Sequence, residues 1–301
     1  MRAIVTGGAG FIGSHVAGAL LARGDDVTVV DDLSTGKREN VPEGAVLEVV
    51  DIREPLEDLF AGADACFHLA AQADVRVSVE RPDHDAGVNV LGTISVLEAA
   101  RRHGTQVVFA STGGAIYGEC EGPAPEDAER RPLSPYGVSK LAGEEYLAAY
   151  NRLYGTRHVA LRYGNVYGPR QDPKGEAGVV AIFLSRLAAG EAPRIFGDGL
   201  QTRDYVYAGD VAQATLGAVG RDGVFNVGSG TETSVVALYE LCRQVAGSDL
   251  QPEFAEARLG ELQRSVLDVS RAERVLGWRP QTSLEEGLRL TWDALAATGA
   301  R

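Results

Sequence analysis

Residues that build disulfide or metal frameworks are scarce in this sequence. It has three cysteines and five histidines among 301 residues. Cys66, Cys120 and Cys242 have neither the density of a disulfide framework nor the paired spacing of a zinc site, and the histidines are scattered. We therefore expect no metal site. A chain of this length can bury a large core, in one α/β domain or in two closely joined ones.

Positive charge and long apolar runs are also limited. The chain carries 29 basic and 42 acidic side chains, a formal net charge of −13. Nucleic-acid binding requires clustered Lys and Arg, so this balance argues against a nucleic-acid partner. No apolar run reaches the length of a membrane span, and the first residues, MRAIVTGGAG, do not resemble a signal peptide. We expect a cytoplasmic protein with no membrane partner.

Short β-branched runs alternate with helical patterns, mostly in the first half of the chain. This alternation predicts an α/β fold, a Rossmann-type doubly wound parallel sheet covered by helices on both faces. The expected strands cover residues 3–5, 27–30, 46–50, 65–69, 107–110, 159–163 and 224–227. The expected helices cover residues 13–23, 88–102, 136–154, 234–246 and 283–296.

A glycine-rich segment, Gly8-Ala9-Gly10-Phe11-Ile12-Gly13, follows the first expected strand and opens the first expected helix. Such a turn lets a pyrophosphate sit at a helix N-terminus, where free N–H groups and the helix dipole favour negative charge. Asp31 ends the second strand, where it would accept hydrogen bonds from an adenosine ribose. Its charge would repel a 2′-phosphate, which favours NAD over NADP. The alternative for Asp31 is a strand-end turn residue, supported by its neighbour Asp32.

After residue 163 the composition of the sequence changes. Gly, Pro and Asp become more frequent, and fewer segments show a clear strand pattern. We predict an NAD-binding Rossmann domain formed by residues 1–163 plus about 206–230. Residues from about 164 to 205 plus 231–301 would form a smaller α/β lobe that binds the substrate.

The stretch STGGAIYGE, residues 111–119, places two hydroxyls and two adjacent glycines at the end of an apolar strand. A core strand favours branched apolar side chains, whereas glycine lets another group approach the backbone closely. We expect Gly113 and Gly114 to admit the nicotinamide and the substrate ring.

Tyr136 and Lys140 lie four residues apart near the start of an expected helix, which puts both on one face. A surface tyrosine with a lysine along it is the alternative. A free phenol has a pKa of ~10, so making it a base near neutral pH takes roughly 4 kcal/mol. A cation at about 4 Å in a medium of effective dielectric ~20 supplies roughly that much. Lys140 can be that cation, joined by oxidised nicotinamide, and Tyr136 would then accept the proton of a sugar hydroxyl.

Several ordered motifs across the whole chain together resemble one known family, the extended short-chain dehydrogenase/reductases. The resemblance is strongest to its branch of NAD-dependent nucleotide-sugar epimerases and dehydratases. The motifs are TGGAGFIG (6–13), HLAAQA (68–73), NVLGT (89–93), STGGAIYG (111–118), Tyr136-x-x-x-Lys140, LRYGNVYGPR (161–170), RDYVY (203–207) and the late Gly277, Trp278 and Pro280.

The resemblance also indicates the reaction. Dehydratases of the family carry Asp-Glu after the catalytic hydroxyl and uronate decarboxylases carry Glu, whereas Gly113, Gly114 and Ala115 offer no acid. This leaves 4-epimerisation through a transient 4-keto sugar, and STGGAIYG is most similar to bacterial UDP-glucose 4-epimerases. The resemblance thus implies an isomerase of UDP-glucose and UDP-galactose with tightly bound NAD. Alternatives are UDP-glucuronate or UDP-N-acetylglucosamine as substrate, a dehydrogenase that releases NADH, or a non-catalytic NAD-binding sensor.

Individual roles follow from the same resemblance. Tyr136 would be the base, Lys140 its activator and Thr112 the hydroxyl on the substrate oxygen. Ser111 is the alternative hydroxyl, because the segment from Thr112 to Tyr117 is one residue longer than the commoner form. Residues expected to contact NAD, with 51 and 52 near adenine, are Gly7, Gly10, Phe11, Ile12, Gly13, Asp31, Asp32, Asp51, Ile52, Leu69, Ala70, Ala71, Asn89, Tyr136, Lys140 and Tyr163. Residues expected to contact the UDP-sugar are Thr112, Tyr136, Asn165, Val179, Arg203, Arg258, Ser265 and Arg76.

Two of these positions bear on which sugar is bound, and a third bears on the phosphates. Ser265 is small where hexose enzymes often carry a bulky residue, so it would admit an N-acetyl group. Arg76 stands where uronate epimerases carry an arginine for the carboxylate, although a solvent-facing helix charge is the alternative. Arg258 lies in RLGE rather than the usual R-P-G-D, which bears on its phosphate role.

The resemblance further implies a homodimer in which the helices at 88–102 and 136–154 form a four-helix bundle.

Overall fold

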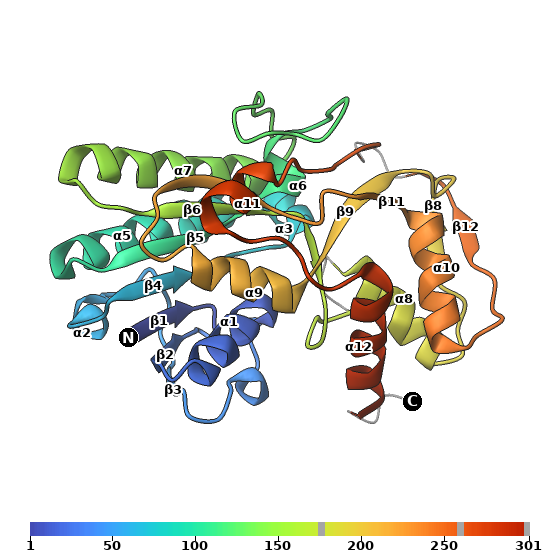
Figure 1. Ribbon diagram of the computed structural model, residues 1–301, viewed down its shortest axis with the longest axis horizontal. Helices are drawn as coiled ribbons and strands as arrows, with labels where there is room; N and C mark the ends of the chain where they lie inside the picture. Colours follow the sequence, from blue (N-terminus) through green and yellow to red (C-terminus); the bar gives the residue numbers. More distant parts are fainter. Residues whose placement is uncertain (174–177, 258–261, 298–301) are drawn as a thin grey trace.

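A seven-stranded sheet forms the centre of the protein. Its structure, a computed structural model, describes residues 1–173, 178–257 and 262–297 (Figure 1). The strand order is β10-β6-β5-β4-β1-β2-β3, and every neighbouring pair is parallel. These strands are β1 (Arg2–Thr6), β2 (Asp26–Val30), β3 (Val46–Glu48), β4 (Ala65–His68), β5 (Gln106–Thr112), β6 (Val159–Tyr163) and β10 (Gly223–Val227). The predicted doubly wound Rossmann-type sheet is confirmed, and its strand order reverses between β1 and β4, where such folds bind ligands.

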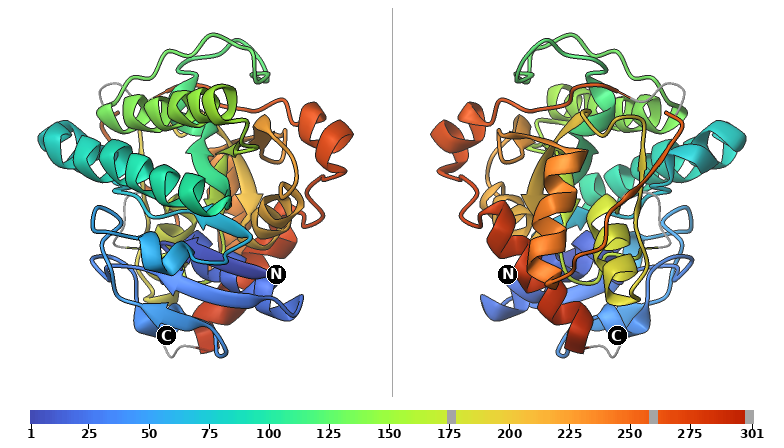
Figure 2. Two further views of the ribbon diagram at one scale, coloured as in Figure 1. Left: turned by 90° about the vertical axis from the view of Figure 1, so that its left-hand side faces the viewer. Right: turned by 90° about the vertical axis from the view of Figure 1, so that its right-hand side faces the viewer.

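Helices cover both faces of this sheet (Figures 1 and 2). On one face, α1 (Phe11–Ala22), α9 (Ala208–Gly217) and α11 (Ser270–Leu276) contribute Val16, Leu20 and Val211, among others, to one apolar core. On the other face, α2 (Glu57–Phe60), α5 (Gly92–His103) and α7 (Pro135–Tyr154) close a second core with side chains such as Val96 and Leu147. Helices α5 and α7 lie side by side on this second face.

The later part of the chain builds two small sheets and three helices beside the main sheet (Figure 1). Strands β7 (Asn165–Tyr167), β9 (Thr202–Tyr207) and β11 (Glu232–Ser234) form one sheet, and β8 (Arg194–Phe196) pairs with β12 (Glu253–Ala255) in the other. A third apolar core joins α8 (Val179–Ala188), α10 (Val235–Ala246) and α12 (Leu284–Ala297). The boundary predicted near residue 206 falls inside β9, and the domain division stays a prediction.

Several elements differ from the sequence expectations. The strand expected over 46–50 ends at Glu48 as β3, and β5 continues through Ser111 and Thr112 before the short helix α6 (Gly113–Ile116). The helix expected from residue 88 is preceded by α3 (Val75–Glu80) and α4 (Pro82–Ala86) and begins with a π-helical turn, η2 (Gly87–Leu91). A single 3-10 turn, η1 (Arg38–Asn40), follows β2.

The boundaries of α7 have a clear local cause. The hydroxyl of Ser134 accepts a hydrogen bond from the N–H of Gly137 at 3.2 Å, and Pro135 occupies the first turn, where its missing N–H costs nothing. The helix ends at Gly155, whose φ of +66° forms a left-handed cap. Tyr136 and Lys140 therefore lie at the start of α7.

Among the described residues, none of the helices combines the length and apolar character required to cross a bilayer.

Candidate active site

Two glycines in the turn from β1 into α1 have no room for a side chain. Gly7 has a φ of +70°, and its N–H donates to the carbonyl of Val30 at 2.8 Å. A Cβ at Gly7 would lie 2.6 Å from the backbone nitrogen of Ala70, and one at Gly13 would lie 2.1 Å from the carbonyl oxygen of Gly7. The loop is therefore packed tightly between the carboxyl ends of β2 and β4.

The N-terminus of α1 is free of side chains that would compete for its N–H groups. Gly10 caps the helix without a side-chain hydrogen bond, and the first turn, which contains Phe11 and Ile12, has no acidic residue. A helix of twelve residues that begins in this way leaves backbone donors and a positive dipole end for an anion. A dinucleotide pyrophosphate fits this position.

Asp31 is held at the end of β2, directly against the glycine-rich loop. Its side chain is buried, and its carboxylate accepts hydrogen bonds from the N–H groups of Ala9 at 3.0 Å and Leu33 at 2.9 Å. Burial raises the pKa of Asp31 above its usual range, and the two backbone hydrogen bonds oppose this shift. Asp32 points into solvent and binds Ser34 at 2.6 Å. The loop and Asp31 together fit the pyrophosphate and ribose of NAD.

Two other predicted cofactor positions have side chains that are occupied in the core. Ile52 is buried in the second core, and the hydroxyl of Tyr163 shares a 2.8 Å hydrogen bond with Thr215. Their predicted contacts with NAD stay predictions. The carboxylate of Asp51 binds the guanidinium of Arg53, which lowers the pKa of Asp51.

Asn89 supports the loop that follows β4. Its side chain accepts from the N–H of Gln72 and donates to the carbonyl of the same residue, both at 2.9 Å. The loop contains the predicted contacts Leu69, Ala70 and Ala71, all partly exposed. Asn89 thus fixes the shape of the loop after β4.

Lys140 extends from α7 to the carboxyl end of β5. The side chain is buried, and its Nζ donates to the carbonyl of Ala110 at 3.0 Å. The same atom lies 4.8 Å from the ring centroid of Phe109 and 5.9 Å from that of Tyr136. The pair predicted from the spacing of Tyr136 and Lys140 is therefore close in space, with the tyrosine partly exposed.

The electrostatic surroundings of this pair differ from the simple sequence-based estimate. Burial lowers the pKa of Lys140 to about 8, and Asp85 and Glu144 oppose that shift. Burial also raises the pKa of Tyr136, and the charge of Asp85 adds to the increase. The estimate from one lysine left out both burial and Asp85. A proton acceptor at Tyr136 therefore needs further positive charge, which oxidised nicotinamide carries.

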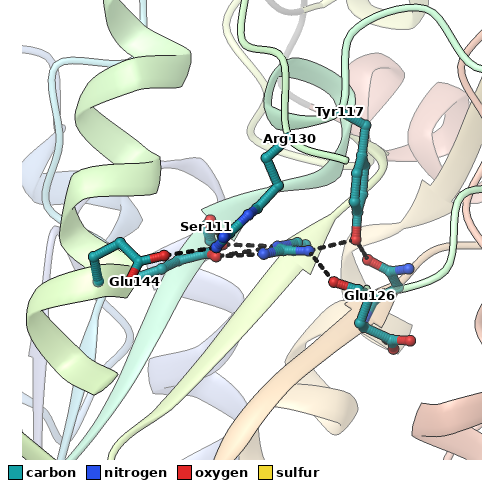
Figure 3. A network of polar contacts seen from close by, with 8 residues as sticks. Ser111, Tyr117, Glu126, Arg130 and Glu144 are labelled. Atoms are coloured by element: carbon teal, nitrogen blue, oxygen red, sulfur yellow. Dashed lines mark hydrogen bonds and ion pairs between the residues drawn. The ribbon is translucent and has the colours of Figure 1, made fainter. Parts of the chain in front are cut away.

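The two hydroxyls at the end of β5 have different surroundings. Ser111 is buried and donates to Glu144 at 2.5 Å, at one end of the network in Figure 3. Arg162 binds both carboxylate oxygens of Glu144 and donates to the hydroxyl of Tyr117 at 2.7 Å. The hydroxyl of Ser111 is thus engaged in a buried ion-pair network, whereas Thr112 is partly exposed.

The two glycines after the strand also differ. A Cβ at Gly113 would lie 2.6 Å from the δ carbons of Leu267, so this glycine packs closely against a buried side chain. A Cβ at Gly114 would lie 3.7 Å from Oδ1 of Asn165 and 4.0 Å from Oγ1 of Thr112. Gly114 therefore lies between two of the predicted substrate-binding side chains.

The remaining predicted substrate residues come from several elements. Val179 begins α8, Arg203 lies on β9, and the buried Ser265 donates its N–H to the carbonyl of Thr202 at 3.2 Å. Arg76 is exposed on α3. Arg258 lies outside the described residues.

Sequence reasoning missed three buried charged residues near Lys140. Asp85, Glu144 and Arg162 are 0%, 4% and 1% exposed. Glu144 stands four residues after Lys140, and Asp85 stands four residues before Asn89, so each shares a helix face with a residue that was identified. This spacing is too common to be a usable signal by itself.

The fold and the site define a class of protein. A glycine-rich loop after the first strand of a doubly wound sheet, with a carboxylate at the end of the second, is the arrangement of a dinucleotide-binding enzyme. The sequence model of the NAD dependent epimerase/dehydratase family matches residues 3–228, and the chain belongs to this family. It is an NAD-dependent isomerase.

Individual relatives match almost the whole chain. It is 47% identical over 306 residues to the UDP-glucose 4-epimerase of Mycolicibacterium smegmatis, which covers 97% of both chains. The structure of UDP-glucose 4-epimerase from Thermotoga maritima with UDP-glucose is similar with a TM-score of 0.97, 46% identity and coverage of 99% of both chains. That of the Thermus thermophilus UDP-glucose 4-epimerase complex with NAD has a TM-score of 0.92 and 48% identity, and covers 98% of this chain and 99% of its own.

Proposed function

We propose that this protein is a UDP-sugar 4-epimerase that interconverts UDP-glucose and UDP-galactose through a transient 4-keto sugar, with tightly held NAD. The observation that carries the proposal is the Tyr136–Lys140 pair at a strand end that offers no acid. The first carboxylate after the strand, Glu119, accepts from the N–H groups of Gln263 at 3.0 Å and Arg264 at 2.8 Å. It is therefore engaged elsewhere, and elimination of a hydroxyl lacks a proton donor.

The chain's own residues would divide the work as follows. Thr112 orients the C4 hydroxyl, and Tyr136 accepts its proton at the phenolic oxygen and later returns it. Lys140 supplies positive charge beside the phenolate. NAD, held by the glycine-rich loop and Asp31, would supply the hydride acceptor for C4 and the hydride donor for the opposite face of the 4-keto sugar. Asn165, Val179, Arg203, Ser265 and Arg258 would hold the nucleotide sugar, with arginine suited to the diphosphate.

The test of the reaction is anomeric-proton NMR of the purified protein with UDP-glucose, UDP-N-acetylglucosamine and UDP-glucuronate in separate samples and no added cofactor. Formation of UDP-galactose supports the proposal and shows that NAD is carried with the protein. Turnover of only the N-acetyl or only the uronate substrate moves the assignment to that sugar, with Ser265 or Arg76 as the residue to exchange. Absence of turnover with all three, even after NAD is added, overturns the proposal in favour of a sensor.

A pair of variants tests the catalytic hydroxyl. Because Ser111 is bound to Glu144, we expect Thr112→Val to lower kcat about a hundredfold, the range of a lost general-acid–base or orienting contact. We expect Ser111→Ala to retain kcat within about threefold and to lower thermal stability, because Glu144 loses one hydrogen bond. The reverse result would move the catalytic role to Ser111. NMR assays at saturating UDP-glucose and thermal melts measure both effects.

We also infer a homodimer built on α5 and α7. An exposed apolar stripe runs along α7 through Val138, Tyr146 and Leu153, which are 54%, 40% and 72% exposed, and Leu91 of η2 is 62% exposed. Such a stripe at helical spacing suits a second helix pair. Light scattering after gel filtration should give twice the 31.8 kDa chain mass, and Leu153→Glu should give monomers. A monomeric parent protein would overturn the inference.

A cytoplasmic location stays a prediction.

A further inference from the structure

Asp85 is a fully buried carboxylate to which the proposed chemistry gives no role. It lies on α4 with 0% exposure. Its Oδ1 accepts from Nε2 of Gln72 at 3.0 Å and from Nδ2 of Asn89 at 2.9 Å, and its Oδ2 accepts from the hydroxyl of Ser139 at 2.6 Å. All three partners are neutral donors. Donors alone around a carboxyl group are the arrangement of an ionised carboxylate, which only accepts.

These hydrogen bonds join the two halves of the site. Ser139 is the residue before Lys140 and the third after Tyr136 in the same turns of α7. Gln72 and Asn89 shape the loop after β4, where the nicotinamide end of the crevice is expected. One carboxylate therefore connects the helix that carries the proposed base to the loop after β4.

The charge of Asp85 also reaches the reactive pair. The titratable groups around Lys140 are Tyr136 and Glu144 from α7, Asp85 from α4 and His68 from β4. Burial keeps His68 neutral by lowering its pKa to about 3. Glu144 is compensated by Arg162 from β6 in a 2.6 Å ion pair. Asp85, with neutral partners, is the carboxylate whose field on Lys140 is least cancelled.

We propose that Asp85 is a positioning residue for the Tyr136–Lys140 pair, which fixes the turn that carries both side chains and holds Lys140 in its ammonium form. This role rests on the proposed function of that pair in 4-epimerisation. Its negative charge opposes the lowering of the Lys140 pKa by burial and raises the pKa of Tyr136. Loss of the charge should therefore move both ionisations toward lower pH.

Lysine NMR tests this electrostatic role without any assay of activity. The chain has three lysines, Lys37, Lys140 and Lys174, so labelling with [ε-¹³C]lysine gives three signals. Lys37→Arg and Lys174→Arg assign the two others. In Asp85→Asn the amide can still accept from Gln72 and Asn89 and can donate to Ser139, so hydrogen bonding is preserved while the charge is removed.

We expect the Lys140 signal of Asp85→Asn to titrate about one pH unit below that of the wild type. Asp83→Asn removes an exposed carboxylate from the same short helix and should leave the midpoint unchanged. An unchanged midpoint in folded Asp85→Asn overturns the electrostatic role, whether or not the protein epimerises UDP-glucose. If Asp85→Asn does not fold by circular dichroism, Asp85→Ser removes the same charge and is measured instead.

The pH dependence of kcat separates positioning from general damage. For Asp85→Asn the whole pH–rate profile should move toward lower pH, which a merely structural defect would not cause. Ser139→Ala keeps the charge but removes the link to α7, so kcat should fall several-fold at every pH with the profile in place. Full activity of Ser139→Ala would overturn the positioning role. If the parent protein turns over none of the UDP-sugars, the proposed function fails, while the lysine titration still decides the role of the charge.

Discussion

At the scale of single residues, two adjacent glycines with the same sequence context have different structural reasons. Gly113 has no room for a Cβ because of the buried Leu267, whereas Gly114 faces Thr112 and Asn165 at ordinary contact distances. A rule based on sequence treats both as one glycine pair. The structure packs Gly113 against a buried leucine and places Gly114 beside two predicted substrate-binding side chains.

Substitutions at these two glycines should therefore affect different properties, stability for Gly113 and activity for Gly114. Gly113→Ala should lower the free energy of unfolding by about 1–3 kcal/mol, the usual cost of overpacking a core. Gly114→Val places methyl groups against Thr112 and Asn165, so it should lower kcat/KM about tenfold or more with little loss of stability. Urea denaturation and the NMR assay measure the two quantities. Full activity of Gly114→Val would show that this glycine serves only the turn.

The residues that could be predicted from the sequence are those whose roles are indicated by their spacing along the chain. The glycine-rich loop and Asp31 each follow an expected strand. Tyr136 and Lys140 lie about one helical turn apart. Asp85 could not be read in this way, because its partners Gln72 and Ser139 lie 13 and 54 residues away. Its role depends on long-range packing, which periodicity does not contain.

At the scale of elements, the buried pair Arg162–Glu144 connects the strand β6 to the helix α7. The side chains are each 2% exposed, and the ion pair measures 2.6 Å. The sequence predicted both elements, since β-branched runs and helical periodicity are local signals. It did not predict the π-helical turn before α5, nor the extension of β5 to Thr112, where the added residues pair with β6.

Loss of one partner of this pair should be costly. Arg162→Met leaves Glu144 buried with only Ser111 as a donor among its named partners, so unfolding free energy should fall by about 3–5 kcal/mol. The double variant Arg162→Met, Glu144→Leu removes the uncompensated charge and should recover part of this loss. Urea denaturation of both variants decides the matter. Equal instability of the single and double variants would mean that lost packing between the strand and the helix, and not the buried charge, causes the destabilisation.

At the scale of the whole molecule, the strand order had to come from the structure. Sequence alternation predicted a parallel sheet, but it does not state that β4 pairs with β1 or that β10, from residues 223–227, pairs with β6. This order places the glycine-rich loop, the loop after β4 and the end of β5 along one edge. The candidate site is thus a consequence of topology, and its separate motifs acquire a common function there.

Buried histidines should make the whole molecule sensitive to acid. His158 is buried, its Nδ1 accepts from the N–H of Val107 at 3.0 Å, and burial lowers its pKa to about 4. Burial likewise lowers the pKa of His68 to about 3, and partial burial lowers that of His15 to about 4. Near pH 6.5 and below, histidines of the unfolded chain bind protons that the same histidines do not bind in the folded state. The free energy of unfolding therefore decreases as the pH falls from 7 toward 4.

His158→Asn isolates one of these contributions. The amide oxygen can accept from Val107 but cannot take up a proton, so the variant should lose about 2 kcal/mol less unfolding free energy than the wild type between pH 7 and pH 5. His103→Asn changes an exposed imidazole and serves as the control, with the same pH dependence as the wild type. Urea denaturation at both pH values gives the differences. An equal loss in His158→Asn and the wild type would show that other groups, and not this buried imidazole, govern the acid sensitivity.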